Sequence, residues 1–250
     1  MRRIEINPKY SYLRTFIESV PERMLHEGKL LKDGRNMIKV LQTPDGQQLN
    51  VKRYHIPAVP NRLIYSLGLR KPKGQRAYEY PEILLQKGIS TPENIAYIEE
   101  RQGGLLGYSY FICTQCDYEH ELYEVGHAPS GTYDELAVAL ATFTAHMHDA
   151  GVMHRDYSPG NILWRKDAEG YHFSIIDINR MYFGPVDMQH GCANFARLWG
   201  PKQFIEVLAK AYAQQRGFDE EQAVKITMKY RARFWKRFLK KHTVSFEVEL

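Results

Sequence analysis

One short stretch of the chain carries residue types that could transfer a phosphoryl group, at the spacing which that chemistry uses. Residues 154–161 read HRDYSPGN. Phosphoryl transfer from ATP needs a carboxylate that orients the acceptor hydroxyl and takes its proton, and an amide oxygen in the same loop that holds Mg²⁺ on the phosphates. Asp156 and Asn161 have that spacing, and the alternative is an ordinary loop with a polar cluster. His154 is predicted to brace the loop rather than to act as a base or a ligand.

A second metal ligand is expected at the end of a buried strand shortly downstream, because oxygens from two segments must converge on the metal and the phosphates. Residues 173–176 read FSII and are followed directly by Asp177. The segment 165–170 is polar and ends in glycine, which is typical of a hairpin turn between two short strands. The sequence therefore indicates Asp177 as the second candidate ligand.

The elements that bind the nucleotide are expected in a three-stranded meander near the N-terminus. Strands are predicted over residues 29–32, 37–43 and 48–54, with turns between them. In a kinase the first turn covers the ATP phosphates, and the third strand holds a lysine that pairs with them. Gly34 and Lys52 suit these two roles, although the turn has a single glycine where kinases have G-x-G-x-x-G.

Lys52 also needs a carboxylate on the following helix to hold its ammonium group in place. The next acidic residues are Glu79 and Glu82. We favour Glu79, because apolar Ile83 lies four residues later on the same helical face. Pro81 is typical of a first turn, so this helix is predicted to begin near Glu79 or to be kinked. The alternative for Glu79 is a solvated surface position.

Two helices have clear apolar periodicity, over residues 9–27 and 133–150. The first is predicted to pack on the small lobe, with a break near Pro21. The second ends at Gly151 and delivers the chain to the motif at 154–161.

Two further strands are predicted over residues 94–99 and 107–116. The second would end at an interlobe hinge near residues 115–118. Backbone groups of that hinge could bind adenine.

The composition fits a folded protein of two unequal lobes. The chain has 250 residues with 44% hydrophobic content, which is enough for a full core. We predict an N-lobe over residues 1–117 and a C-lobe over residues 118–250. No run of about 18 apolar residues and no signal peptide occur, so we expect a cytoplasmic protein. Cys113-x-x-Cys116 has no second pair, and buried reduced thiols are expected.

The distribution of charge points to anionic partners. The net charge is +5, and residues 47–78 and 222–246 are two basic zones without acids. The first would flank a kinase cleft and suits an anionic hydroxyl acceptor. Within the second, residues 229–242 combine an aromatic face with seven Lys/Arg, a pattern of helices that lie on anionic membranes. The alternative is that the aromatic face packs on the core; no nucleic-acid partner is expected.

In this order, these segments resemble the bacterial lipopolysaccharide core kinases, which belong to the protein-kinase-like superfamily and phosphorylate Kdo or heptose. The resemblance covers residues 30–200 and is carried by VK at 51–52, RAYE at 76–79, GISTP at 88–92, HRD at 154–156, NIL at 161–163 and IDINRM at 176–181. Asp-Ile-Asn at 177–179 stands where protein kinases have Asp-Phe-Gly. The phenylalanine switch of those enzymes is therefore not expected.

The resemblance implies a two-lobed α+β protein-kinase-like fold, with a small β-rich N-lobe and a mainly helical C-lobe. It also implies the use of ATP and Mg²⁺ to phosphorylate a sugar hydroxyl of a lipid-linked acceptor, at the cytoplasmic face of the inner membrane. Carried over to this chain, Asp156 would be the base, and Asn161 and Asp177 would be the metal ligands. Lys52 would be the lysine that binds the phosphates.

The nearest alternative function is a serine/threonine protein kinase or another small-molecule kinase. Against a protein kinase, no Ala-Pro-Glu follows Asp177, and the roughly seventy residues beyond it are few for a peptide-docking lobe. A kinase-shaped scaffold without activity is a third possibility. It is disfavoured because the candidate lysine, base and metal ligands are all present.

Overall fold

The computed structural model describes residues 1–249, which form two compact units. The N-terminal unit comprises Met1–Gln86 and Thr91–Asp117. The C-terminal unit comprises Lys87–Ser90 and the chain from Tyr118 onward. Neither unit is therefore a single continuous segment of the sequence.

An antiparallel six-stranded sheet in the order β1-β5-β6-β4-β3-β2 forms the centre of the N-terminal unit. Its strands are β1 (Arg2–Ile6), β2 (Lys29–Lys32), β3 (Met37–Gln42), β4 (Gln48–Tyr54), β5 (Asn94–Gln102) and β6 (Leu105–Thr114). The predicted meander is confirmed as β2, β3 and β4, and the two later predicted strands as β5 and β6. The sequence did not indicate β1, which pairs with β5 and places Ile4 opposite Ile98.

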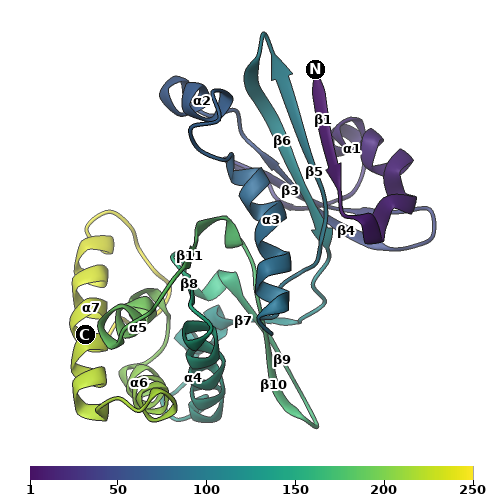
Figure 1. The fold of residues 1–250 in the computed structure, drawn as a ribbon. Coiled ribbons are helices and arrows are strands. Elements are labelled where there is room, and N and C mark those ends of the chain that lie inside the picture. Colours follow the sequence, from purple (N-terminus) through teal and green to yellow (C-terminus); the bar gives the residue numbers. More distant parts are fainter. Residues whose placement is uncertain (250) are drawn as a thin grey trace. The chain divides into compact units, whose positions relative to one another are not determined.

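Helices cover both faces of this sheet (Figure 1). The 3₁₀ helix η1 (Pro8–Leu13) and α1 (Arg14–His26) lie on one face. The single helix predicted over residues 9–27 is therefore divided into two. The predicted break near Pro21 is wrong, because α1 continues through this buried proline.

The opposite face of the sheet is covered by α3 (Lys73–Gln86). Of the two alternatives predicted for this helix, a start near Glu79 is wrong, since the helix begins six residues earlier and Pro81 lies inside it. A kink at Pro81 stays a prediction. A further helix, α2 (Val59–Ser66), lies in the basic zone between β4 and α3 and was not expected.

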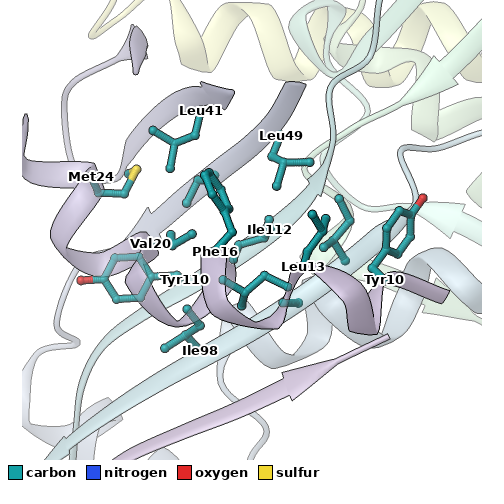
Figure 2. Packing of buried hydrophobic residues seen from close by; sticks show 14 residues of the cluster. Tyr10, Leu13, Phe16, Val20, Met24, Leu41, Leu49, Ile98, Tyr110 and Ile112 are labelled. Atoms are coloured by element: carbon teal, nitrogen blue, oxygen red, sulfur yellow. The ribbon is translucent and has the colours of Figure 1, made fainter. Parts of the chain in front are cut away.

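The face under α1 holds the larger apolar cluster of the N-terminal unit (Figure 2). Buried side chains recur every three or four residues along η1 and α1, at Leu13, Phe16, Ile17, Val20 and Met24. They pack against alternate strand residues such as Leu49 and Val51 of β4, and Tyr110 and Ile112 of β6. Because side chains alternate along a strand, Lys52 faces the other side of the sheet.

On that other side, Tyr54 packs with Ala77 of α3 and with Phe111. The helix approaches the strands closely at Gly74, where a Cβ would lie 2.8 Å from the ring of Tyr97 and 3.3 Å from that of Tyr54. Glycine is therefore required at the start of α3. Lys52 shares this face, with its Nζ 5.2 Å from the ring centroid of Tyr54.

The C-terminal unit is mainly helical. Its helices are α4 (Asp134–Asp149), α5 (Met188–Asn194), α6 (Lys202–Arg216) and α7 (Glu220–Phe238), with the 3₁₀ helices η2 (Leu122–His127), η3 (Pro159–Asn161), η4 (Ile178–Arg180) and η5 (Phe195–Arg197). Its short strands are β7 (His120–Glu121), β8 (Val152–His154), β9 (Ile162–Asp167), β10 (Gly170–Ile175) and β11 (Met181–Phe183). The predicted helix over residues 133–150 is confirmed as α4, and the predicted hairpin as β9 and β10. None of the helices within residues 1–249 is both long enough and apolar enough to span a membrane.

The aromatic side of α7 packs inside the C-terminal unit. Trp235 is buried, and its ring contacts Phe238 and Phe246. Arg231 is buried on the same side, where its guanidinium donates hydrogen bonds to the carbonyl oxygens of Leu198 at 2.6 Å and Gly200 at 2.8 Å. Burial lowers the pKa of Arg231 to about 10, so it remains a cation at neutral pH. This cation therefore belongs to the core and not to the solvated face.

Cys113 is a buried thiol, as expected, whereas Cys116 of the same pair is only partly buried. The third cysteine, Cys192, is also buried. Burial raises the pKa of the Cys113 thiol to about 12. Such a thiol stays protonated at neutral pH and is a poor nucleophile and a poor metal ligand.

Candidate active site

Three predicted site residues lie on neighbouring segments of the C-terminal unit. Asp156 follows β8, Asn161 ends η3, and Asp177 follows β10. Asn161 Nδ2 donates a hydrogen bond to the carbonyl oxygen of Asp156 at 2.8 Å, and the carbonyl oxygen of Asn161 accepts one from the Ile176 N–H at 3.0 Å. Asn161 thus joins the segment of Asp156 to that of Asp177. Because its Nδ2 is held, its Oδ1 is left in a fixed direction as an acceptor or ligand.

His154 makes a second connection between the same segments. Its Nδ1 accepts a hydrogen bond from the Asp156 N–H at 3.0 Å, and its Nε2 donates to the carbonyl oxygen of Ile176 at 3.0 Å. Burial lowers the pKa of His154, which favours the neutral ring that this arrangement needs. The prediction that His154 braces the loop is confirmed.

Asp177 has an unusual backbone conformation. At φ 55° and ψ 42° it is the one residue other than glycine, within the described chain, that has a positive φ. Such conformations cost free energy and concentrate at functional sites. Asn179 Nδ2 donates a hydrogen bond to Asp177 Oδ1 and so fixes its carboxylate. Carboxylate and amide oxygens are donors that Mg²⁺ accepts, so the groups of Asp177 and Asn161 fit a magnesium ion chemically.

Two guanidinium groups contact the carboxylate of Asp156. Arg197 of η5 donates to Asp156 Oδ1, and Arg180 Nη1 lies 3.6 Å from Oδ2. The guanidinium of Arg197 lies 5.3 Å from the ring centroid of Phe234, and its partial burial lowers its pKa. These contacts hold the Asp156 side chain in one orientation.

A buried chain of hydrogen bonds supports β8 from behind. Arg216 donates to the Tyr212 hydroxyl at 2.8 Å, and that hydroxyl donates to His148 Nδ1 at 2.8 Å. His148 Nε2 then donates to Asn194 Oδ1 at 3.3 Å, and Asn194 Nδ2 donates to the carbonyl oxygen of His154 at 3.0 Å. This series of hydrogen bonds, with each group donating to the next from Arg216 to His154, requires a neutral His148 ring whose Nδ1 accepts and whose Nε2 donates. Burial favours that state and lowers the pKa of His148 to about 3.

The other predicted site residues belong to the N-terminal unit. Lys52 lies in β4 on the face that α3 covers, and Gly34 lies in the turn between β2 and β3. A Cβ added at Gly34 would meet no atom within 4 Å. No contact within the described protein therefore requires glycine at this position.

Glu79 lies in α3, where its carboxylate accepts hydrogen bonds from Lys71 Nζ at 2.7 Å and from Gln75 Nε2 at 3.0 Å. Lys71 comes from the basic zone that precedes α3. Gln86 donates to Glu82 in the same helix at 3.4 Å. The pairing of Lys52 with Glu79 or with Glu82 stays a prediction.

Four residues that support the site were not identified from the sequence: Asn179, Arg180, Asn194 and Arg197. Asn179 could have been found, because it lies two positions after Asp177 and replaces the glycine of Asp-Phe-Gly. Arg197 lies 41 residues from Asp156, and no spacing rule points to it. Asn194 lies 40 residues from His154, and only the packing of α5 brings it to that strand.

Solved structures with the same overall fold are protein-kinase-like. The structure of WaaP in complex with acyl carrier protein superposes with a TM-score of 0.61 at 16% identity, covering 96% of this chain and 100% of that one. The structure of the gentamicin–APH(2″)-IIa complex superposes with a TM-score of 0.53 at 14% identity, covering 91% of this chain and 88% of that one. The predicted two-lobed kinase fold is thus confirmed.

The model of the lipopolysaccharide kinase (Kdo/WaaP) family matches residues 22–198. This match spans more than half of the chain, and the protein belongs to that family. It is therefore a kinase that acts on lipopolysaccharide. The matched range contains every predicted site residue and ends before α6 and α7.

The neutral state of His148 predicts a specific loss of stability in acid. Its pKa is about 3 when folded and about 6.5 when unfolded, so its contribution to stability is complete above pH 6.5 and is lost as the pH falls toward 3. Between pH 6.5 and 4.5 the free energy of unfolding should fall by about 2–3 kcal/mol through this one group. Urea unfolding of the parent and of His148→Gln, at several pH values, measures the difference.

The matched control is His26→Gln at an exposed position on α1. If His148→Gln folds too poorly, an NMR titration of His148 in the parent protein gives the pKa directly. A titration midpoint near pH 6.5, or an unchanged pH dependence in His148→Gln, would refute the buried neutral ring.

Proposed function

We propose that the protein transfers the γ-phosphoryl group of ATP to a hydroxyl of a lipopolysaccharide core sugar, Kdo or heptose. The observation that carries this proposal is the convergence of Asp156, Asn161 and Asp177 in a member of the lipopolysaccharide kinase family. A serine/threonine protein kinase shares such a site, but the family match favours the sugar acceptor.

In this mechanism the Asp156 carboxylate orients the acceptor hydroxyl and takes its proton. Arg197 and Arg180 keep that carboxylate in place. Asn161 Oδ1 and the Asp177 carboxylate would hold Mg²⁺, which neutralises charge on the phosphates when it is bound.

The N-terminal unit would supply the groups that hold the nucleotide. Lys52 is proposed to pair with the phosphates, and the turn at Gly34 to cover them. Glu79 is proposed as the partner that fixes the Lys52 ammonium. For that role Glu79 would have to exchange its present partner, Lys71, for Lys52.

A cavity of about 300 Å³ in the N-terminal unit is our candidate for binding an anionic part of the acceptor. Residues that line it include Arg35, Tyr54, His55, Asn61, Tyr65 and Lys73. Within the described chain none of the residues lining it is acidic. A positive cavity of this size suits the carboxylate or phosphate of a core sugar.

The cations of α7 are proposed to attract the protein to an anionic membrane surface at the cytoplasmic face. The aromatic side of this helix is occupied by packing, so its cations would act without an inserted apolar face. The four cations meant here, called the α7 cations, are Lys236 and Arg237 in the last turn of α7 and Lys240 and Lys241 in the turn that follows it. All four are exposed, and none of them forms an ion pair with another residue of the described chain. Each cation near anionic lipid contributes about 1 kcal/mol.

Two aspartate variants separate the proposed base from the proposed metal ligand. Asp156→Ala should lower turnover by ~10²–10⁴ and leave ATP·Mg²⁺ binding nearly intact, because a positioned base acts on the chemical step. Asp177→Ala should weaken binding of the metal–nucleotide pair, because it removes a ligand to the cation. Calorimetry and steady-state rates measure these effects, with Asp167→Ala on the β9–β10 hairpin as control. Full activity of either variant would exclude its assigned role.

The acceptor cavity is tested by the double variant His55→Gln with Lys73→Gln. Loss of charge-assisted hydrogen bonds should raise the acceptor KM by about tenfold or more and leave the KM for ATP unchanged. Arg14→Gln, at an exposed cation on α1 outside the cavity lining, is the control. An equal rise of both KM values, or of neither, would argue against an acceptor subsite here.

The α7 proposal predicts vesicle binding that depends on charge. Replacing Lys236, Arg237, Lys240 and Lys241 with Gln should weaken co-sedimentation with phosphatidylglycerol-containing vesicles, and raised salt should weaken it in the parent. Exchange of the exposed Arg14, Lys29, Lys32 and Arg35 for Gln in the N-terminal unit changes the net charge equally and is the control. Equal losses in both quadruple variants would show a nonspecific charge effect and no role for α7.

A further inference from the structure

The helix α2 and the turn after it expose a dense group of large apolar side chains. Five of them lie within eleven residues: Val59 is 70% exposed, Leu63 45%, Ile64 36%, Leu67 72% and Leu69 74%. Scattered apolar residues are normal on a protein surface, but a contiguous group usually marks a contact site. We propose that residues 59–70 insert into the surface of an anionic membrane and seat the N-terminal unit on it.

The helix has a fixed inner side, which determines the direction of the exposed side chains. Tyr65 is buried. Ser66 Oγ accepts a hydrogen bond from the Leu106 N–H at 2.8 Å, and Arg62 Nε donates to the carbonyl oxygen of Leu106 at 2.7 Å. Arg101 also donates to the carbonyl oxygen of Ser66 at 3.2 Å. These bonds attach α2 to the β5–β6 hairpin.

The outer side of α2 therefore points away from the sheet that anchors the helix. Val59, Leu63 and Leu67 follow one another at intervals of four residues, so they share one face. Figure 1 shows α2 at the periphery of the N-terminal unit, beside β6. The apolar face is thus presented by a helix whose orientation is set by hydrogen bonds, and not by a loosely attached segment.

The charged residues near the apolar face of α2 indicate an anionic partner. No acidic residue occurs between Gln47 and Tyr78. Arg70 directly follows Leu69, is exposed, and forms no ion pair with any residue in 1–249. Apolar side chains beside an exposed cation match the acyl boundary and the phosphate groups of an anionic bilayer.

A second copy of the chain fits this face less well. In a two-fold symmetric contact the same patch meets itself, so the cations of both copies would be brought together. The segment offers no carboxylate to pair with them. An anionic lipid surface satisfies both the apolar residues and the cation.

The inner side of the same helix lines the cavity described above, through Asn61 and Tyr65. Seating α2 on a bilayer would therefore place the cavity within one helix diameter of the headgroups. This consequence rests on the proposed function, since it concerns a lipid-linked acceptor. Membrane binding by α2 itself does not, because it needs neither ATP nor an acceptor.

The first test is co-sedimentation of the full chain with vesicles of phosphatidylcholine alone or mixed with phosphatidylglycerol. The four α7 cations are replaced with Gln in all proteins compared, so that only other surfaces contribute. Leu63→Gln, Leu67→Gln and Leu69→Gln together should lower the partition coefficient on mixed vesicles about tenfold or more. The matched control is Leu25→Gln, Leu30→Gln and Leu31→Gln, which removes three exposed leucines of α1 and β2 from the same unit. The control should change the coefficient by less than about twofold.

The second test places a reporter in the segment, using the parent chain with its α7 cations intact. The fluorescence of a Leu67→Trp variant should be quenched by vesicles of brominated phosphatidylglycerol, whereas that of a Leu25→Trp variant should not. Signal from the natural tryptophans is subtracted with the parent protein. Circular dichroism verifies that each variant is folded.

Three results would overturn the proposal. One is equal vesicle binding by the two triple-leucine variants, and another is the absence of selective quenching at position 67. The third is sedimentation equilibrium showing a dimer of the parent that the α2 variant cannot form, which would assign this face to self-association.

Discussion

The geometry of the proposed catalytic loop depends on one buried, neutral imidazole. His154 accepts from the Asp156 N–H and donates to the carbonyl oxygen of Ile176, so it holds the segment before Asp156 against the segment before Asp177. A protonated ring would have two donors and could not accept from the Asp156 N–H. Burial lowers the pKa of His154 and so favours the neutral ring, which is the protonation state that the loop requires. His148 must be neutral as well, because its ring takes part in the hydrogen bonds that run through Asn194 to the carbonyl oxygen of His154.

In the N-terminal unit the corresponding constraint is the alternation of side chains along β4. Val51 belongs to the cluster under α1, and Tyr54 packs against α3, so Lys52 is directed to the α3 face. A shift of register by one residue would exchange these faces and place a lysine in the apolar cluster, which is why the register is strongly specified. The close approach of α3 at Gly74 completes this arrangement, and the same basic zone supplies both Lys71 for Glu79 and the apolar face of α2.

The sequence predicted the parts of the fold and the site that depend on short-range spacing. The β2–β3–β4 meander, α4 and the β9–β10 hairpin follow from local periodicity and turn residues, and Asp156, Asn161 and Asp177 follow from a motif and the strand after it. It missed β1, because that strand is defined by pairing with β5, which lies far along the chain. It missed Arg197 and Asn194 for the same reason, since only tertiary packing brings them to the loop. In α7 it identified the apolar stripe, but the burial of Arg231 beside Trp235 could not be seen from composition.

Phosphorylation of a lipopolysaccharide core sugar by this site is the central claim, and it can be measured on the natural product. Glycolipids are extracted from cells that make the protein, from cells that lack it, and from cells that make Asp156→Ala at the same level. Mass spectrometry should show a core glycolipid with one additional phosphate only when the unaltered protein is present, and fragmentation should place that phosphate on Kdo or heptose. Identical phosphate content in the three extracts, or the extra phosphate in cells that make Asp156→Ala, would contradict the proposed function of the site.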